Sequence, residues 1–209
     1  MTTTPDKKTQ WLNAILNDVH ALMGSDAYFR LWVKAQEAAN TPHGPISQVI
    51  ISNYVSFQLA GIRRLCDTRR DVIALPKLLN RIKRDQPYRA TAIGHLLSRL
   101  DTECGELCRL ATLYIAHSAD PDMAKNWKAW KLTSAQLTTT HKAICEVAII
   151  IERDLLQITQ RTSLIRVFQG DYLAEVKSYV PEDQLPALRE FWHAHNDMVN
   201  KWVYVARPV

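Results

Sequence analysis

Two long stretches of this 209-residue chain repeat apolar residues at alternating steps of four and three. The first runs from Pro87 to Ala116 with the seam Ile93, Leu97, Leu100, Cys104, Leu107, Ala111 and Tyr114. The second runs from Thr133 to Ile158 with the seam Leu137, His141, Ile144, Ala148, Ile151, Leu155 and Ile158. Such seams are typical of helices that pack along their length. Because a polar segment, 118–131, joins them, the sequence predicts an antiparallel pair.

Helical periodicity also covers most of the remaining chain. It predicts a helix that begins at Pro5 and stops at Gly24, and a second one up to residue 40 that Ser25 or Asp26 could cap. Apolar residues on two stripes between Ser47 and Cys66 predict a central helix packed on two faces. Further helices are expected at 77–84, after Pro76, and at 183–203. Thr133 and Gln136 fit a capping box at the start of the second long helix.

The cysteines and the apolar runs indicate the class of protein. Cys66, Cys104, Cys108 and Cys145 all lie in helical patterns beside apolar neighbours, which is typical of reduced thiols in a cytoplasmic protein. The start of the chain has no apolar leader, and the longest apolar run, 147–151, is far shorter than a membrane span. We therefore expect a cytoplasmic protein that is not inserted in a membrane.

Metal and cofactor sites are not expected. Cys104 and Cys108 share a helix face, but no further ligands cluster with them in the sequence. The two rings of His193 and His195 should point to different faces of their helix, which does not suit a zinc site. His141 and His195 occupy seam positions, where a histidine is usually a core or interface residue.

Positive charge is concentrated in one block. The chain carries a net charge of +5, yet the segment from Gly61 to Ala90 alone carries +6, from nine basic residues against three aspartates. The basic residues are Arg63, Arg64, Arg69, Arg70, Lys77, Arg81, Lys83, Arg84 and Arg89. Such a block attracts phosphate backbones, although a solvated helix face with a few ion pairs has the same composition. We call this block, 63–89, the basic corner.

A histidine stands where the first long helix ends, within Glu106–Pro121. His117 could move a proton near neutral pH, but a histidine at a helix C-terminus also binds the terminal carbonyls and complements the helix dipole. At 100° per residue, Leu110 and Leu113 share its face to within about 40°, whereas Arg109 sits about 80° away. The residues alone leave both interpretations open.

Several motifs resemble the AbiU2-like branch of the HEPN superfamily. They are Asn53-Tyr54-Val55, then Gly61 to Asp67 (GIRRLCD), then Leu75 to Leu79 (LPKLL), then Tyr114 to Ser118 (YIAHS), followed by a helix near His141. The resemblance covers about residues 46–160. It implies an all-α, antiparallel helical bundle with this core. The length and the helical periodicity of the chain add the expectation of a single domain, 1–209, in which N-terminal helices (5–40) and an additional C-terminal helix (183–203) pack on that core. It also implies a homodimer found in abortive-infection and toxin–antitoxin systems, with an antitoxin or defence-system partner.

Many HEPN proteins are metal-independent ribonucleases with an arginine, four to six residues and a histidine at the dimer cleft. The histidine corresponds to His117. The nearest arginine before it on the same helix is Arg109, and seven residues lie between the two, compared with four to six in the family. Arg63 or Arg64, brought near by folding, is the alternative. The position two residues after the histidine, where some HEPN toxins have a modified tyrosine, is Ala119, so this sequence does not predict that modification.

The sequence therefore suggests an RNA-directed toxin or phage-defence protein. In an active ribonuclease, the 2′-OH beside the scissile phosphate would attack, His117 would act as acid or base, and an arginine would stabilise the phosphorane. RNA would lie on Arg63, Arg64, Arg69, Arg70, Arg81 and Arg84. The competing hypothesis is a non-catalytic helical module that binds RNA or a protein partner through the same basic corner.

Overall fold

The computed structural model of the chain describes residues 6–41, 44–69, 71–117, 132–158, 172–174 and 176–204, and for 114–117 the backbone alone. Its long elements are α1 (Lys7–Ala38), α2 (Pro45–Leu65), α3 (Leu75–Asp85), α4 (Ala90–His117), α6 (Ser134–Ile150) and α7 (Leu185–Lys201). Short helical turns cover Pro87–Arg89, Ile151–Leu155, Glu182–Gln184 and Trp202–Tyr204. The described residues contain helices and no strand, so the expected all-α class is confirmed.

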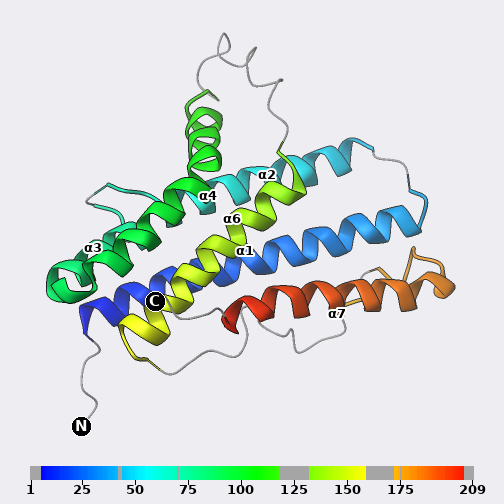
Figure 1. Cartoon of the computed structure of the whole chain (residues 1–209). Coiled ribbons are helices and arrows are strands. Elements are labelled where there is room, and N and C mark those ends of the chain that lie inside the picture. Colours follow the sequence, from blue (N-terminus) through cyan, green and yellow to red (C-terminus); the bar gives the residue numbers. More distant parts are fainter. Residues whose placement is uncertain are drawn as a thin grey trace.

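Helix α1 is the element around which the others pack. It contacts α2, α3, α6 and α7, and Figure 1 shows it running along the length of the bundle. Its buried residues Leu12, Ile15, Val19, Ala27 and Leu31 belong to a core cluster that extends from the first helix to the last. A single apolar core therefore joins all six long helices.

The prediction that Gly24 ends the first helix is wrong. Helix α1 continues through Gly24 to Ala38, so the two expected N-terminal helices are one. Glycine in a helix costs only about 1 kcal/mol relative to alanine, and burial of Leu22, Met23 and Ala27 on both sides of it outweighs that cost. Asp26 is consequently not an N-cap but a buried residue inside the helix.

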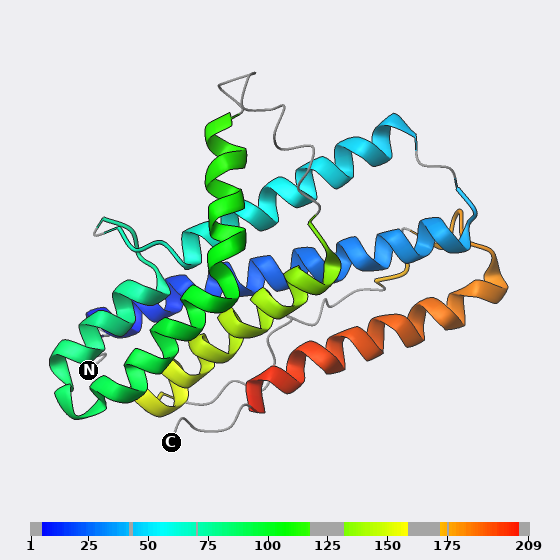
Figure 2. The ribbon, with the colours of Figure 1, turned by 45° about the horizontal axis from the view of Figure 1, so that its top comes forward.

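Helices α4 and α6 pack against each other, and Figures 1 and 2 show them running in opposite directions. The seam residues Leu100 and Ile151 are 3% and 0% exposed, and the Thr140 hydroxyl donates to the Glu103 carbonyl oxygen at 2.7 Å. The capping box of Thr133 and Gln136 is present. The antiparallel pair is therefore confirmed. Figure 2 also shows that α4 bends, so that its C-terminal part projects from the bundle.

The prediction that the second helix packs on two faces is wrong. Its inner stripe, with Leu59, Ile62 and Leu65, is buried, but its outer stripe is open in the single chain. The exposed outer residues are Ile46 (77%), Val49 (59%), Ile50 (37%) and Phe57 (47%). Helix α2 contacts α1 and α4 on its inner side, and Figure 2 shows its N-terminal half on the outside of the bundle. This outer stripe is called the α2 apolar face.

The last helix closes the opposite side of the bundle. Helix α7 packs on α1 and buries Leu188, Trp192, His195 and Val199, as its spacing predicts. Trp192 and Trp202 are 6% and 8% exposed, so the chain itself covers both rings. All four cysteines are free thiols. Among the described residues, no helix is both long and apolar enough to cross a membrane.

Candidate functional site

The basic corner consists of the end of α2, the loop that follows, α3 and the turn Pro87–Arg89. Some of its cations are paired. Arg64 forms an ion pair with Asp18 of α1 at 3.1 Å, Arg69 pairs with Asp67 at 2.9 Å, and Arg89 donates to the backbone carbonyl of Asp154. The hydrogen bonds from Arg69 lower the pKa of the Asp67 carboxyl. The predicted RNA-binding residue Arg70 lies outside the described residues.

Three cationic side chains lie around the ring of Trp11 of α1, beside this corner. The ammonium groups of Lys7 and Lys77 lie 5.6 and 4.9 Å from the centre of its ring, and the guanidinium carbon of Arg81 lies 5.8 Å from it. Arg81 Nε is buried and has no hydrogen-bond partner among the described residues. A buried donor without an acceptor is costly, so this group suits an incoming anion.

A cavity of about 420 Å³ opens at this tryptophan. Its lining residues are Trp11, Thr68, Arg69, Lys77, Asn80, Arg81 and Arg84. Of the residues that line it in the described part of the chain, four are cations and none is an anion. Cavities of about 300–1,000 Å³ hold small organic ligands, so there is room for more than a phosphate ion.

A larger cavity of about 530 Å³ adjoins the first, because both include Thr68, Arg69 and Asn80. One wall is α4, from Leu97 to Thr112, and Arg63 lies on the other side. The two adjacent arginines thus have different places: Arg63 faces the cavity and α4, whereas Arg64 binds α1. Sequence position alone could not separate them.

His117 is the last residue of α4, and its side chain lies outside the described residues. Arg109 is an exposed residue of the same helix. Thr112, at the end of the larger cavity, precedes His117 by five residues, which is about 7.5 Å along a helix. The pairing of His117 with Arg109, Arg63 or Arg64 therefore stays a prediction.

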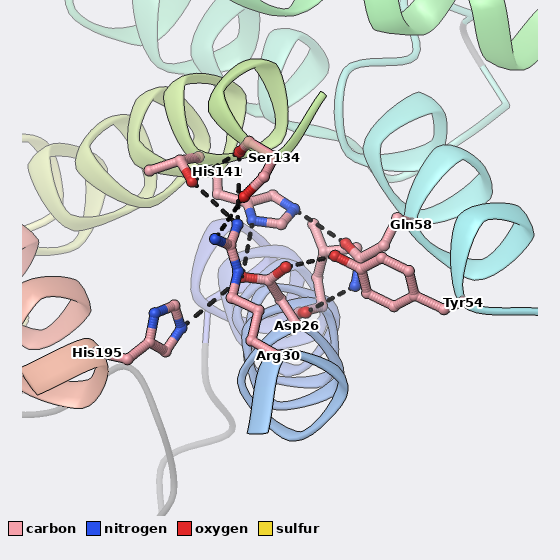
Figure 3. A network of polar contacts seen from close by, with 9 residues as sticks. Asp26, Arg30, Tyr54, Gln58, Ser134, His141 and His195 are labelled. Atoms are coloured by element: carbon pink, nitrogen blue, oxygen red, sulfur yellow. Dashed lines mark hydrogen bonds and ion pairs between the residues drawn. The ribbon is translucent and has the colours of Figure 1, made fainter. Parts of the chain in front are cut away.

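A second group of polar residues lies inside the bundle, around Asp26, and Figure 3 shows it. Asp26, 3% exposed, accepts a hydrogen bond from Arg30 Nε at 2.8 Å and another from the Tyr54 hydroxyl. The other side of the Arg30 guanidinium donates to the hydroxyls of Ser134 and Thr138 on α6, at 2.7 and 3.0 Å. This cluster, with Gln58, His141 and His195, is called the Asp26 network.

Two histidines face Asp26 from different helices. Nδ1 of His141 and Nε2 of His195 each lie 3.8 Å from Asp26 Oδ2 (Figure 3). The Gln58 amide donates to the Leu22 carbonyl at 3.2 Å, which leaves its oxygen to accept from His141 Nε2 at 2.9 Å. His141 is therefore the tautomer with its proton on Nε2.

Burial determines the charge of these groups. It lowers the pKa of His141 to about 4 although Asp26 opposes the change, and it also lowers the pKa of His195. Burial, and then the Asp26 carboxylate, raises the pKa of Tyr54. Both imidazoles are thus neutral near pH 7, in a network that ties α1 to α2, α6 and α7. The seam spacing predicted the core positions of His141 and His195, but it did not predict their shared partner.

No group of three or more His, Cys, Asp or Glu side chains in the described part of the chain could hold a metal ion. His193 is exposed and contacts the Tyr172 hydroxyl at 3.3 Å, while His195 is buried, so the two rings point to different sides of α7 as predicted.

Comparison of the chain with family models, with curated proteins and with solved structures finds no match.

Proposed function

We propose that this protein binds RNA through the basic corner, with the cavity at Trp11 as the primary contact. The observation that carries the proposal is the composition of that cavity, which combines one indole with Arg69, Lys77, Arg81 and Arg84. Lysine and arginine neutralise phosphates, and an indole or guanidinium plane stacks on an unpaired base. Single-stranded RNA offers both groups at once, so it is the substrate class that fits.

The binding test removes four charges from the corner. In the variant with Arg69, Arg70, Arg81 and Arg84 all changed to Ser, affinity for labelled single-stranded RNA should fall. The dependence of log K on log salt should become shallower by up to about 3, since each phosphate contact contributes about 0.7. The matched control changes Lys34, Lys142, Arg189 and Lys201 to Ser, four exposed cations elsewhere. Equal effects of the two quadruple variants would show that net charge alone is responsible.

Cleavage of the bound RNA is the second candidate, supported by the position of the larger cavity. Its α4 wall leads toward His117, and Arg63 stands across from that wall. In the proposed reaction, the 2′-OH attacks the adjacent phosphorus and gives up its proton to a base. The 5′ oxygen of the next nucleotide leaves with a proton, and the products are a 2′,3′-cyclic phosphate and a 5′-hydroxyl. His117 would transfer these protons, and an arginine would stabilise the charged phosphorane.

The cleavage test uses purified protein in EDTA, which excludes catalysis by contaminating metal-dependent nucleases. His117→Ala should abolish cleavage while RNA binding persists. Arg63→Ala should lower the cleavage rate, and Arg64→Ala, which removes an ion pair with Asp18, should not. Loss of activity in Arg109→Ala alone would assign the arginine to α4 instead. Binding without cleavage in the wild-type protein would leave the binding module as the function.

We also propose that the chain forms a homodimer through the α2 apolar face. Ile46, Val49, Ile50 and Phe57 lie at helical spacings of three, four and seven residues, and leaving them in water is unfavourable. Helix α4 packs on the inner side of α2, but its C-terminal part projects from the bundle (Figure 2), so in the proposed dimer the two projecting ends, and both His117 residues, approach a shared cleft.

Light scattering tests the dimer directly. Val49→Glu should yield monomers, whereas Gln48→Glu, an equally charged change at the exposed neighbouring position, should not. A monomeric wild-type protein at micromolar concentration would rule the dimer out.

Action as a toxin in phage defence, countered by an antitoxin, is proposed from the resemblance. Growth arrest on expression of wild-type protein in bacteria, but not of His117→Ala, would support it.

A further inference from the structure

Three cysteines from two helices meet at the wall of the larger cavity. Cys66 directly follows the last residue of α2, and Cys104 and Cys108 are one turn apart on α4. The Cys66 thiol hydrogen-bonds with both of the other two. Cys66 and Cys108 line the cavity, whereas Cys104 is 0% exposed. A small reagent that enters the cavity therefore meets two of the three thiols.

The surroundings of these thiols distinguish their chemistry. A hydrogen bond from Cys66 lowers the pKa of Cys108, and the charge of Arg63 acts in the same direction. Burial and the carboxylates of Asp67 and Asp101 oppose this change but do not reverse it. The pKa of Cys66 is raised, first by its hydrogen bonds with the other two thiols and then by burial. Cys108 thus ionises before Cys66, and a thiolate is the nucleophilic form of cysteine.

We propose that Cys108 and Cys66 form a peroxide-reactive dithiol, in which Cys108 attacks the oxidant and Cys66 closes a disulfide. The argument for this dithiol does not rest on RNA binding, although both thiols line the larger cavity that is proposed for RNA cleavage.

Both steps balance with hydrogen peroxide as the oxidant. The Cys108 thiolate attacks one peroxide oxygen, the O–O bond breaks, and the second oxygen leaves and takes a proton to become water. Cys108 is then a sulfenic acid, oxidised by two electrons. The Cys66 sulfur, having lost its proton, attacks the Cys108 sulfur, the S–O bond breaks, and hydroxide leaves with that proton as water. Two thiols and one peroxide give one disulfide and two waters.

The position of Cys66 allows the bond to close. A disulfide requires the sulfurs at about 2.05 Å, closer than any hydrogen bond, so one side chain must move. Cys66 lies just beyond the end of α2 at Leu65, outside any helix, whereas Cys108 is held within α4. Cys145 serves as an internal reference, because it is fully buried in α6 and burial raises its pKa.

The experiment treats the reduced full-length protein with hydrogen peroxide and maps the thiols by mass spectrometry. Digestion with trypsin and a glutamate-specific protease separates Cys104 from Cys108, because Glu106 lies between them. The expected product is a peptide pair that joins Cys66 to Cys108, with Cys104 and Cys145 still reduced. A disulfide that includes Cys104, or equal oxidation of all four thiols, would overturn the proposal.

Two variants assign the roles. Cys108→Ser should slow peroxide consumption at least tenfold, while Cys66→Ser should accumulate a sulfenic acid at Cys108 that dimedone traps. Cys104→Ala is the matched control and should retain the Cys66–Cys108 disulfide. Undiminished peroxide consumption in Cys108→Ser would contradict the assignment. If a variant does not fold, the peptide map of the wild-type protein decides the question by itself.

Discussion

The Asp26 network and the basic corner both gather charged groups, but they use them in opposite ways. In the network, a buried carboxylate meets a guanidinium, a phenol and two neutral imidazoles, so the chain satisfies its own charge. In the corner, Lys77, Arg81 and Arg84 line an open cavity in which the described residues place no acidic side chain. The difference separates charge that holds the fold together from charge that lines a cavity open to a ligand.

The free-energy cost of removing a charged side chain should differ between the two regions. Removing one member of a buried pair leaves the other unsolvated, which costs several kcal/mol, whereas an exposed pair contributes little. We therefore expect changes in the Asp26 network to alter stability more than binding, and changes in the basic corner to alter binding more than stability.

The largest expected effect is that of Asp26→Ala. This change leaves Arg30, whose side chain is only 20% exposed, without its carboxylate, and it removes the acceptor of the Tyr54 hydroxyl. The free energy of unfolding in urea should fall by about 3–5 kcal/mol. RNA affinity of the folded protein should stay the same. A loss below about 1 kcal/mol would mean that water replaces the missing carboxylate and that the network is not a stabilising element.

The second prediction concerns pH. The pKa of His141 is about 4 in the folded chain and 6.5 in the unfolded chain. Between these two pH values the unfolded chain therefore binds more protons than the folded chain. Stability should therefore fall as pH is lowered, by about 2 kcal/mol from pH 7 to pH 5. His195 acts in the same direction, since its pKa is also lowered. At both rings, burial and the charge of Arg30 lower the pKa, whereas the Asp26 carboxylate acts to raise it.

The measurement is urea unfolding of the wild type and of His141→Gln at both pH values. The variant should lose most of the pH dependence. His95→Gln is the control, because the exposed His95 ring loses little water on folding. An equal pH dependence in the wild type and in His141→Gln would assign the effect to other groups.

The same two regions show what the sequence could predict. The basic corner was recognisable because its charges are close together in the chain, and the α4–α6 pair because its seams are periodic. The network was not, because its members come from four helices and extend from Asp26 to His195. Trp11 was missed in the site for the same reason, since only folding places it beside Lys77. The prediction of a helix end at Gly24 was wrong because the low helix propensity of glycine favours a break, whereas tertiary packing keeps the helix continuous.

The third prediction separates stacking from charge in the basic corner. Trp11→Leu removes the ring but keeps an apolar side chain, so RNA affinity should fall about tenfold or more, as base–aromatic stacking is worth about 1–3 kcal/mol. The salt dependence of binding should stay unchanged, unlike that of the quadruple variant. Trp32→Leu, the same change on the same helix, is the control because Trp32 packs near Phe29 away from the corner. A shallower salt dependence in Trp11→Leu would show that the ring acts by positioning the cations.

The smallest effect is expected at Asp85, the acidic residue of the corner that pairs with Lys8 at 3.1 Å. The hydrogen bond from Lys8, and then the charges of Lys8 and of two arginines of α3, lower the pKa of its carboxyl, yet the group is exposed and water screens it. Asp85→Ala should leave the midpoint of urea unfolding unchanged. It also frees Lys8 and removes a negative charge near Arg81 and Arg84, so RNA affinity at low salt should rise by less than about tenfold.

Together with Asp26→Ala, this variant compares the same side-chain change in both regions. We expect loss of stability without loss of binding inside the bundle, and a gain of binding without loss of stability at its surface. A drop in affinity would mean that the Lys8–Asp85 pair shapes the cavity, and that the basic corner, like the Asp26 network, depends on its internal pairs.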